Sequence, residues 1–177
     1  MKIRDMVFTA LFAAVICAVA PFIILLPFSP VPLSLATLVI YIAAASMNWK
    51  TGTLAVALYL LIGMIGLPVF SGFHGGVHKL VGPTGGFLIG YIPCAFVIGL
   101  IVDRFELRKW LYPVSMALGT AVLYACGTVW IMVSLKYTLA AALMACVIPF
   151  LIGDAAKIIF ASVIAPLLRK ALKKQGT

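Results

Sequence analysis

The sequence predicts an all-α, polytopic membrane protein with six transmembrane helices. Of the 177 residues, 65% are hydrophobic and only 10% are charged, and the mean hydropathy is +1.24. A soluble domain of this size cannot cover so much apolar surface. The apolar residues also form near-continuous runs, and a helix of about 20 such residues crosses a bilayer. Basic residues gather at the ends of these runs, as they do in membrane proteins.

Prolines, glycines and charges divide the chain into six expected spans. The PFSPVP turn separates the first two spans, and the charged loop at residues 103–110 separates the fourth from the fifth. A short interfacial helix is expected before Pro149, and residues 169–177 are expected to form a tail. Neither an internal repeat nor a second domain is evident, so residues 1–177 are expected to form one domain. The expected spans are residues 6–26, 33–47, 51–66, 83–102, 111–135 and 149–168.

The basic residues predict the orientation of the chain. If the N-terminus is cytoplasmic, ten of the thirteen lysines and arginines lie on the inner side, and only Lys79 and Lys136 lie outside. Lys157 falls within the sixth span. This bias follows the positive-inside rule and predicts that both termini are cytoplasmic. No basic stripe with interleaved aromatic residues is present, so nucleic acid is not an expected partner.

The stretch at residues 66–90 is expected to form an outer loop between the third and fourth spans. It holds eight of the fifteen glycines and both histidines. Glycine has no Cβ, so such a segment can lie close against helices or a ligand. We therefore expect a lid over a binding site. His74 and His78 are four residues apart, but two glycines separate them and the loop lacks an acidic residue, so no metal site is expected.

Asp154 and Lys157 are the only charged residues expected inside a span. Each costs roughly 2.5–3.5 kcal/mol at the centre of a bilayer when it is alone. Their i, i+3 spacing places them on one face of a helix, where they can partly neutralise each other. Two interpretations remain open: an ion pair that only locks the helix in place, or an outward-facing polar binding site. Lys79 likewise is either a ligand-binding cation in the lid or a solvated loop lysine.

Missing motifs argue against catalysis. The chain contains no GxxxxGK[ST] or GxG nucleotide signature, and no HExxH or GxSxG motif. It has only four acidic residues, so candidates for acid–base catalysis are almost absent. We expect neither enzymatic activity nor a bound cofactor, and any transport must draw its energy from a partner.

The first span carries a face of small residues. Ala10, Ala14 and Ala18 recur every four residues, which brings them onto one side of a helix. Small residues at this spacing allow another helix to pack closely. This face is a candidate partner interface.

Three segments together resemble one transporter family. They are PFSPVPLSLATL, GLPVFSGFHGGVHKLVGPTGGFLIGY and PFLIGDAAK, and the similarity covers nearly the whole chain. They resemble the biotin-specific S-component of energy-coupling-factor (ECF) transporters, the BioY family. The resemblance implies a six-helix protein of the prokaryotic plasma membrane that captures biotin from outside. It also implies association with the coupling protein EcfT and two ATPases, which alone bind ATP, and contact of the small-residue face with EcfT.

The resemblance also implies a set of ligand contacts. Asp154 can accept a hydrogen bond from the ureido ring of biotin and Lys157 can donate one, which leaves Lys79 for the valerate carboxylate. Contact of Lys157 with the carboxylate is equally open. Two rival functions also stay open, namely an S-component for a different vitamin and a structural or assembly membrane protein. The expected ligand-binding residues are Asp154, Lys157, Lys79, Tyr91, Phe73, Gly75, Gly76 and Thr84.

Overall fold

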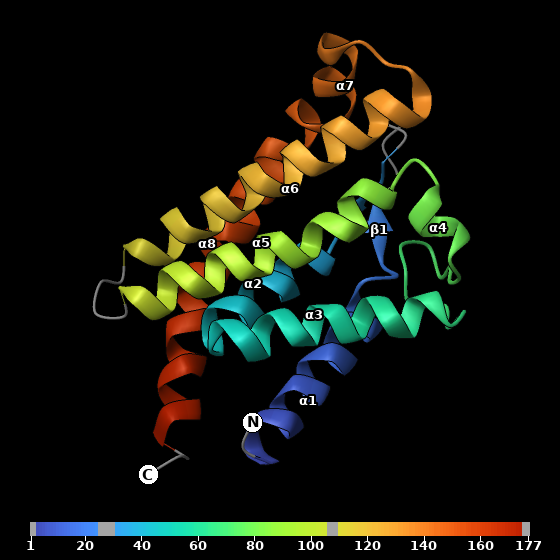
Figure 1. Cartoon of the computed structure of the whole chain (residues 1–177). Coiled ribbons are helices and arrows are strands. Elements are labelled where there is room, and N and C mark those ends of the chain that lie inside the picture. Colours follow the sequence, from blue (N-terminus) through green and yellow to red (C-terminus); the bar gives the residue numbers. More distant parts are fainter. Residues whose placement is uncertain (1–2, 25–30, 106–109, 175–177) are drawn as a thin grey trace.

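The computed structural model describes residues 3–24, 31–105 and 110–174. Helices dominate it (Figure 1), which confirms the all-α prediction. The helices are α1 (Ile3–Val19), α2 (Ala36–Ser46), α3 (Trp49–Met64), α4 (His78–Val81), α5 (Gly85–Arg104), α6 (Leu111–Leu135), α7 (Leu139–Cys146) and α8 (Ile148–Lys174). Two short strands, β1 (Ile23–Ile24) and β2 (Leu33–Ser34), form an antiparallel pair.

The longer helices form a bundle with two distinct ends. Helix α5 packs along α6 and α3, and α2 lies between α5 and α8. Both chain ends lie at one end of the bundle, together with the C-terminus of α5 and the N-terminus of α6 (Figure 1). The β1–β2 pair and α4 lie at the opposite end, which we call the loop end. The six longer helices run alternately between these two ends.

The helix lengths bear on the number of spans. In the described part of the chain, α5, α6 and α8 are long and apolar enough to cross a membrane. Helix α6 has the predicted bounds. Helix α2 has only 11 residues, which at 1.5 Å per residue extends about 16 Å, roughly half of a bilayer core about 30 Å thick. Six full crossings therefore remain a prediction.

The first predicted span is wrong at its C-terminal end. Helix α1 stops at Val19 rather than continuing to Leu26, which lies outside the described residues. The cause is Pro21, because the residue before a proline is driven away from helical geometry. Residues 23–24 become β1 instead. Its partner strand occupies Leu33 and Ser34, so the second span starts late, at Ala36.

The last apolar run divides close to the expected point, but its end differs from the prediction. Helix α7 precedes the break, and Pro149 sits in the first turn of α8, where proline is tolerated. Helix α8 continues to Lys174, six residues beyond the expected end. Interpretation of the basic C-terminal segment as a simple tail was therefore wrong. Arg169 in this segment is only 7% exposed.

Arg169 joins four elements at the end of the bundle that holds the termini. Its Nη1 donates to the carbonyl oxygens of Ala45 (3.2 Å) and Met47 (3.0 Å), where α2 ends. Its Nη2 forms an ion pair with Asp103 of α5. Asp103 in turn accepts the backbone N–H of Trp49, at the start of α3 (2.7 Å). The carbonyls that α2 cannot satisfy internally thus receive protein donors.

Two glycines allow α5 to approach α6 closely. A Cβ on Gly86 would lie 2.1 Å from Cβ of Trp130, and one on Gly90 would lie 3.1 Å from Cβ of Cys126. The expectation that glycines within residues 66–90 lie close against helices is confirmed at these two positions. Gly82 contacts α6 through a hydrogen bond instead, because its carbonyl accepts the indole N–H of Trp130 at 2.9 Å.

Arg169→Met should destabilise the protein, because it removes the ion pair with Asp103 and the donor to two buried carbonyls. Breaking a buried ion pair costs about 3–5 kcal/mol. Asp103 is partly exposed, so we expect a smaller loss of about 2 kcal/mol, or roughly 5 °C in Tm for a chain of this length. Thermal unfolding in detergent measures the shift. Lys170→Met, at the exposed neighbouring residue, is the matched control, and equal Tm values for both variants would contradict the proposed role.

Candidate ligand-binding site

Two neighbouring cavities open at the loop end of the bundle. The first, which we call the carboxylate cavity, has a volume of about 40 Å³. The second, the loop cavity, has a volume of about 210 Å³. Pro32 lines both, so the two cavities adjoin. The carboxylate cavity is lined mainly by Ser34, Thr37, Phe87, Tyr91, Leu123, Tyr124, Phe150, Asp154 and Lys157. The loop cavity is lined mainly by Ile23, Phe70, Ser71, Gly72, His74, Lys79, Thr84 and Leu88.

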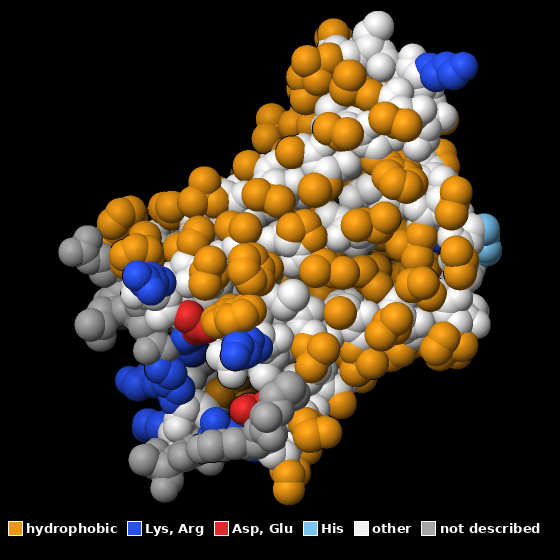
Figure 2. Space-filling view, viewed as in Figure 1, with side chains coloured by type: hydrophobic (Ala, Val, Ile, Leu, Met, Phe, Trp, Pro, Cys, Tyr) orange, Lys and Arg blue, Asp and Glu red, His pale blue; other side chains and the backbone are white. Residues whose placement is uncertain are grey.

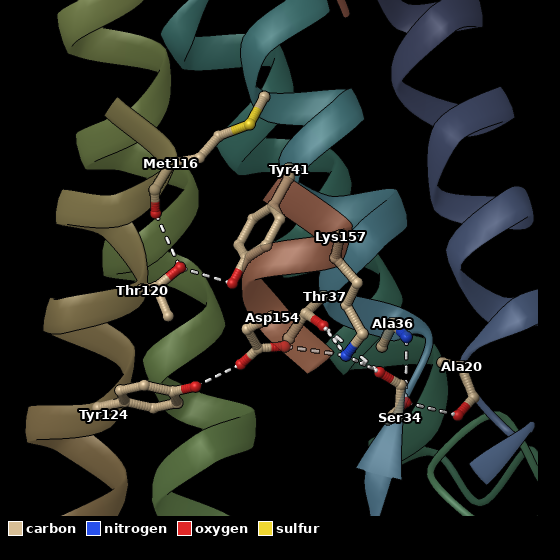
Figure 3. A network of polar contacts seen from close by, with 10 residues as sticks. All are labelled: Ala20, Ser34, Ala36, Thr37, Tyr41, Met116, Thr120, Tyr124, Asp154 and Lys157. Atoms are coloured by element: carbon tan, nitrogen blue, oxygen red, sulfur yellow. Dashed lines mark hydrogen bonds and ion pairs between the residues drawn. The ribbon is translucent and has the colours of Figure 1, made fainter. Parts of the chain in front are cut away.

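Lys157 is the centre of the polar network in the carboxylate cavity (Figure 3). Its Nζ donates to Oδ1 of Asp154 (2.9 Å), to the carbonyl of Ser34 (2.7 Å) and to Oγ1 of Thr37 (2.9 Å). A lysine ammonium has three donors, so each of its protons has a protein acceptor. The residue is only 8% exposed. The charge is therefore both buried and fully hydrogen-bonded.

Asp154 is held from two sides. Its Oδ1 accepts from Lys157, and its Oδ2 accepts the hydroxyl of Tyr124 at 2.6 Å. A carboxylate offers about four acceptor positions. These two hydrogen bonds fix its orientation and still leave acceptor capacity towards the cavity. A ligand with N–H or O–H donors can use that capacity.

Ser34 and Thr37 shape the junction between β2 and α2. The Ser34 hydroxyl donates to the carbonyl of Ala20 (3.1 Å) and accepts the backbone N–H of Ala36 (3.0 Å). Its carbonyl accepts from Lys157, and Thr37, in the first turn of α2, lies beside it (Figure 3). Sequence reasoning missed Ser34, Thr37 and Tyr124 as parts of the site. The available signal was the occurrence of hydroxyl groups within otherwise apolar runs.

The loop that carries Lys79 is anchored to the bundle by backbone hydrogen bonds. The N–H of Gly72 donates to the carbonyl of Pro21 (2.9 Å), and the N–H of Gly76 donates to that of Gly63 (2.7 Å). Both loop glycines have positive φ values, 76° and 96°, which other residues rarely adopt. The glycines therefore allow a fixed loop that sets Lys79 and Thr84 in the wall of the loop cavity.

The structure divides the predicted ligand-binding residues into three groups. Asp154, Lys157 and Tyr91 line the carboxylate cavity, whereas Lys79 and Thr84 line the loop cavity. Three predicted ligand-binding residues are absent from the described linings of both cavities, namely Phe73, Gly75 and Gly76.

The remaining three residues lie within the loop itself. Phe73 is 61% exposed and packs edge-on against Phe22, with ring centroids 5.6 Å apart. A Cβ on Gly75 would lie 2.2 Å from the carbonyl oxygen of Leu67, so this glycine permits close packing of the loop on itself. For Phe73, Gly75 and Gly76, ligand contact remains a prediction.

The charges in the two cavities differ. Asp154 and Lys157 neutralise each other, so the carboxylate cavity presents polar groups without a net charge from this pair. Lys79 adds a cation to the adjoining loop cavity. This arrangement suits a small molecule with a neutral hydrogen-bonding group at one end and an anionic group at the other.

The small-residue face of α1 points away from the bundle. Ala10, Ala14 and Ala18 are exposed, whereas Ala13 and Ile16 on the opposite side are buried in the core. The face is therefore accessible to another helix.

The fold and the cavities together define a helical membrane protein with a candidate small-molecule site at one end of its bundle. Comparison with known proteins gives the family. The BioY family model matches residues 1–174, and the chain belongs to the BioY family.

Named relatives are similar over almost their whole length. A biotin transporter BioY from Thermotoga maritima is 39% identical over 167 residues, which is 94% of this chain and 96% of the relative. One from Rhodobacter capsulatus is 36% identical, covering 92% of this chain and 91% of the relative. The relatives are named as transporters, which confirms the expectation that the chain is not an enzyme.

A solved structure shares the fold. A crystal structure of the S-component for biotin from an ECF-type ABC transporter matches with a TM-score of 0.89 and 28% identity. The match covers 96% of this chain and 92% of that chain. The matched protein is one component of a larger transporter.

Proposed function

We propose that this chain captures biotin as the substrate-binding S-component of an ECF-type transporter in the prokaryotic cell membrane. The observation that carries the proposal is the site itself. A neutral Asp154–Lys157 pair lies in one cavity, and Lys79 lines the cavity next to it. Membership of the BioY family supports biotin as the ligand over another vitamin.

The ureido ring of biotin suits the carboxylate cavity. It is neutral and carries two N–H donors and a carbonyl acceptor. The free acceptor capacity of Asp154 can receive an N–H, while hydroxyls from Thr37 and Tyr124 line the same cavity. An analogue without the N–H would leave the remaining acceptor capacity of a buried carboxylate unused, which is a basis for discrimination. The Phe87 and Tyr91 rings in the lining provide an apolar wall for the bicycle.

The valerate carboxylate is assigned to Lys79. The competing candidate, Lys157, already directs its three protons to Asp154, Ser34 and Thr37. Moving Lys157 to a ligand carboxylate would break those buried hydrogen bonds. Lys79 lies in the adjoining cavity, so the tail of a ligand held at Asp154 can extend towards it.

Uptake additionally needs partners. We propose that the exposed face formed by Ala10, Ala14 and Ala18 docks onto the coupling protein EcfT. Two ATPases would supply the energy and would alone bind ATP. Helices that meet through small residues gain close van der Waals contact, which is the main attraction between helices in a bilayer. A purely structural role is the competing proposal, and it requires no ligand.

Purified wild-type protein should bind biotin, and Asp154→Asn should weaken binding by at least 100-fold, about 2.7 kcal/mol. Tyr124→Phe should cost about tenfold, because it removes one hydrogen bond that orients the carboxylate. Equilibrium binding of labelled biotin measures both effects. Thr138→Val, outside both cavities, serves as a control at a hydroxyl residue. No biotin binding by the folded wild type would overturn the proposed function in favour of another ligand or a structural role.

Lys79→Met should abolish the preference for biotin over biotin amide, in which the carboxylate is replaced by a neutral group. The wild type should favour biotin by at least tenfold, a difference of about 1.4 kcal/mol. Competition binding with the two ligands gives the ratio directly. Lys136→Met removes a different lysine expected on the outer side and should retain the preference. A preference that persists in Lys79→Met would assign the ligand carboxylate elsewhere.

Ala14→Trp should leave biotin binding intact and abolish uptake, because a bulky ring prevents close approach of the partner helix. Uptake of labelled biotin in cells that also supply EcfT and the two ATPases measures this effect. Val15→Trp is the matched control, since one residue along α1 turns the side chain about 100° away. Equal uptake by the two variants would count against this docking face.

A further inference from the structure

A third cavity lies at the end of the bundle that holds both termini, opposite the proposed biotin site. It has a volume of about 150 Å³ and lies between α1, the α2–α3 junction and α8. We call it the basic cavity. Its lining consists of Arg4, Asp5, Phe8, Ser46, Met47, Asn48, Thr51, Arg169, Leu172 and Lys173.

Among the described residues, bases outnumber acids in the lining of the basic cavity. Three bases, Arg4, Arg169 and Lys173, line it with one acid, Asp5. The ion pair between Arg169 and Asp103 offsets a second base. A lining with more bases than acids suits an anionic group such as a phosphodiester. Arg169 is buried and held by two backbone carbonyls, so its position is set before any ligand arrives.

Neighbouring residues place the basic cavity at the level of lipid headgroups. Asn48 in its lining directly precedes Trp49, and Nζ of Lys50 lies 5.3 Å from the centre of the Trp49 ring. Tryptophan and lysine mark the membrane–water interface. The strong basic bias of this end predicts that the interface is the cytoplasmic one. Figure 2 shows lysine and arginine side chains gathered here, next to an extended hydrophobic surface.

The basic cavity also has an apolar part. Phe8, Met47 and Leu172 belong to its lining. On α1, Val7 and Leu11 are exposed apolar residues that extend the hydrophobic surface towards the middle of the bundle. A charged recess with an adjoining apolar surface fits a molecule with a phosphate head and acyl chains. A free phosphate or an acidic peptide would use only the charged part.

We propose that the basic cavity binds the phosphodiester headgroup of an anionic phospholipid from the cytoplasmic leaflet. Basic pockets between transmembrane helices on this side of a membrane are a recognised type of lipid site. The headgroup phosphate contacts Arg4 and Lys173, while Arg169 forms the fixed base of the cavity. The acyl chains lie along the exposed apolar residues of α1.

The test compares ligands on the delipidated full-length protein in a neutral detergent. Phosphatidylglycerol, phosphatidylcholine with the same acyl chains, and inorganic phosphate are each titrated at 0.15 M salt, where surface charges are screened beyond roughly 8 Å. Phosphatidylglycerol should raise Tm and bind at least tenfold more tightly than phosphatidylcholine. Equal effects of the two lipids would overturn the proposal. Stabilisation by inorganic phosphate that equals that by phosphatidylglycerol would identify a free anion as the ligand instead.

Two double variants with the same change in net charge separate the cavity from general surface charge. Arg4→Gln with Lys173→Gln should weaken phosphatidylglycerol binding at least tenfold. Lys170→Gln with Lys174→Gln, on exposed residues of the same helix outside the lining, should change it less than twofold. Biotin binding reports whether each variant is folded, and single Lys173→Gln gives a second measurement if the double variant does not fold. Equal losses in the two double variants would contradict a specific site.

Discussion

One buried ammonium group organises the loop end of this protein. Lys157 is placed within a membrane span, where an unpaired charge is costly, and three protein acceptors satisfy it. Those acceptors come from α8, from β2 and from the first turn of α2. The same contacts therefore neutralise the charge, join the strand pair to the bundle and orient the Asp154 carboxylate. The position of the candidate ligand site follows from where this one charge can be satisfied.

The dependence on Lys157 explains how the roles in the site are divided. A cation that has used all its protons is a poor partner for a ligand carboxylate, but its hydrogen bond to the neighbouring aspartate fixes the position of that side chain. In the proposed function Asp154 then recognises ligand donors, and a second cation, Lys79, lines the separate loop cavity. Asp154 and Lys157 can thus be an ion pair and also part of a binding site. The two interpretations are compatible because the ion pair fixes the groups that face the cavity.

Sequence reasoning predicted the features that depend on composition and on spacing along one helix. These features are the helical class, the bounds of α6, the pairing of Asp154 with Lys157 and the close packing at Gly86 and Gly90. It failed where distant segments decide the outcome. Tyr124 reaches Asp154 across 30 positions, and the Ser34 carbonyl accepts from Lys157 across 123. Arg169 resembled a solvated tail residue because its partners lie on α2 and α5.

Helix α8 is hydrogen-bonded to residues at both ends of α2, and these contacts constrain how a bound ligand can leave. Lys157 holds the residues at the start of α2, and Arg169 holds the carbonyls at its end. Separating the two helices would break four hydrogen bonds from buried cations, and a hydrogen bond to a charged group contributes about 1.5–3 kcal/mol. Movement of the loop, or of the whole bundle in the membrane, avoids that cost. The paired cations therefore favour a mechanism in which α2 and α8 move as one unit.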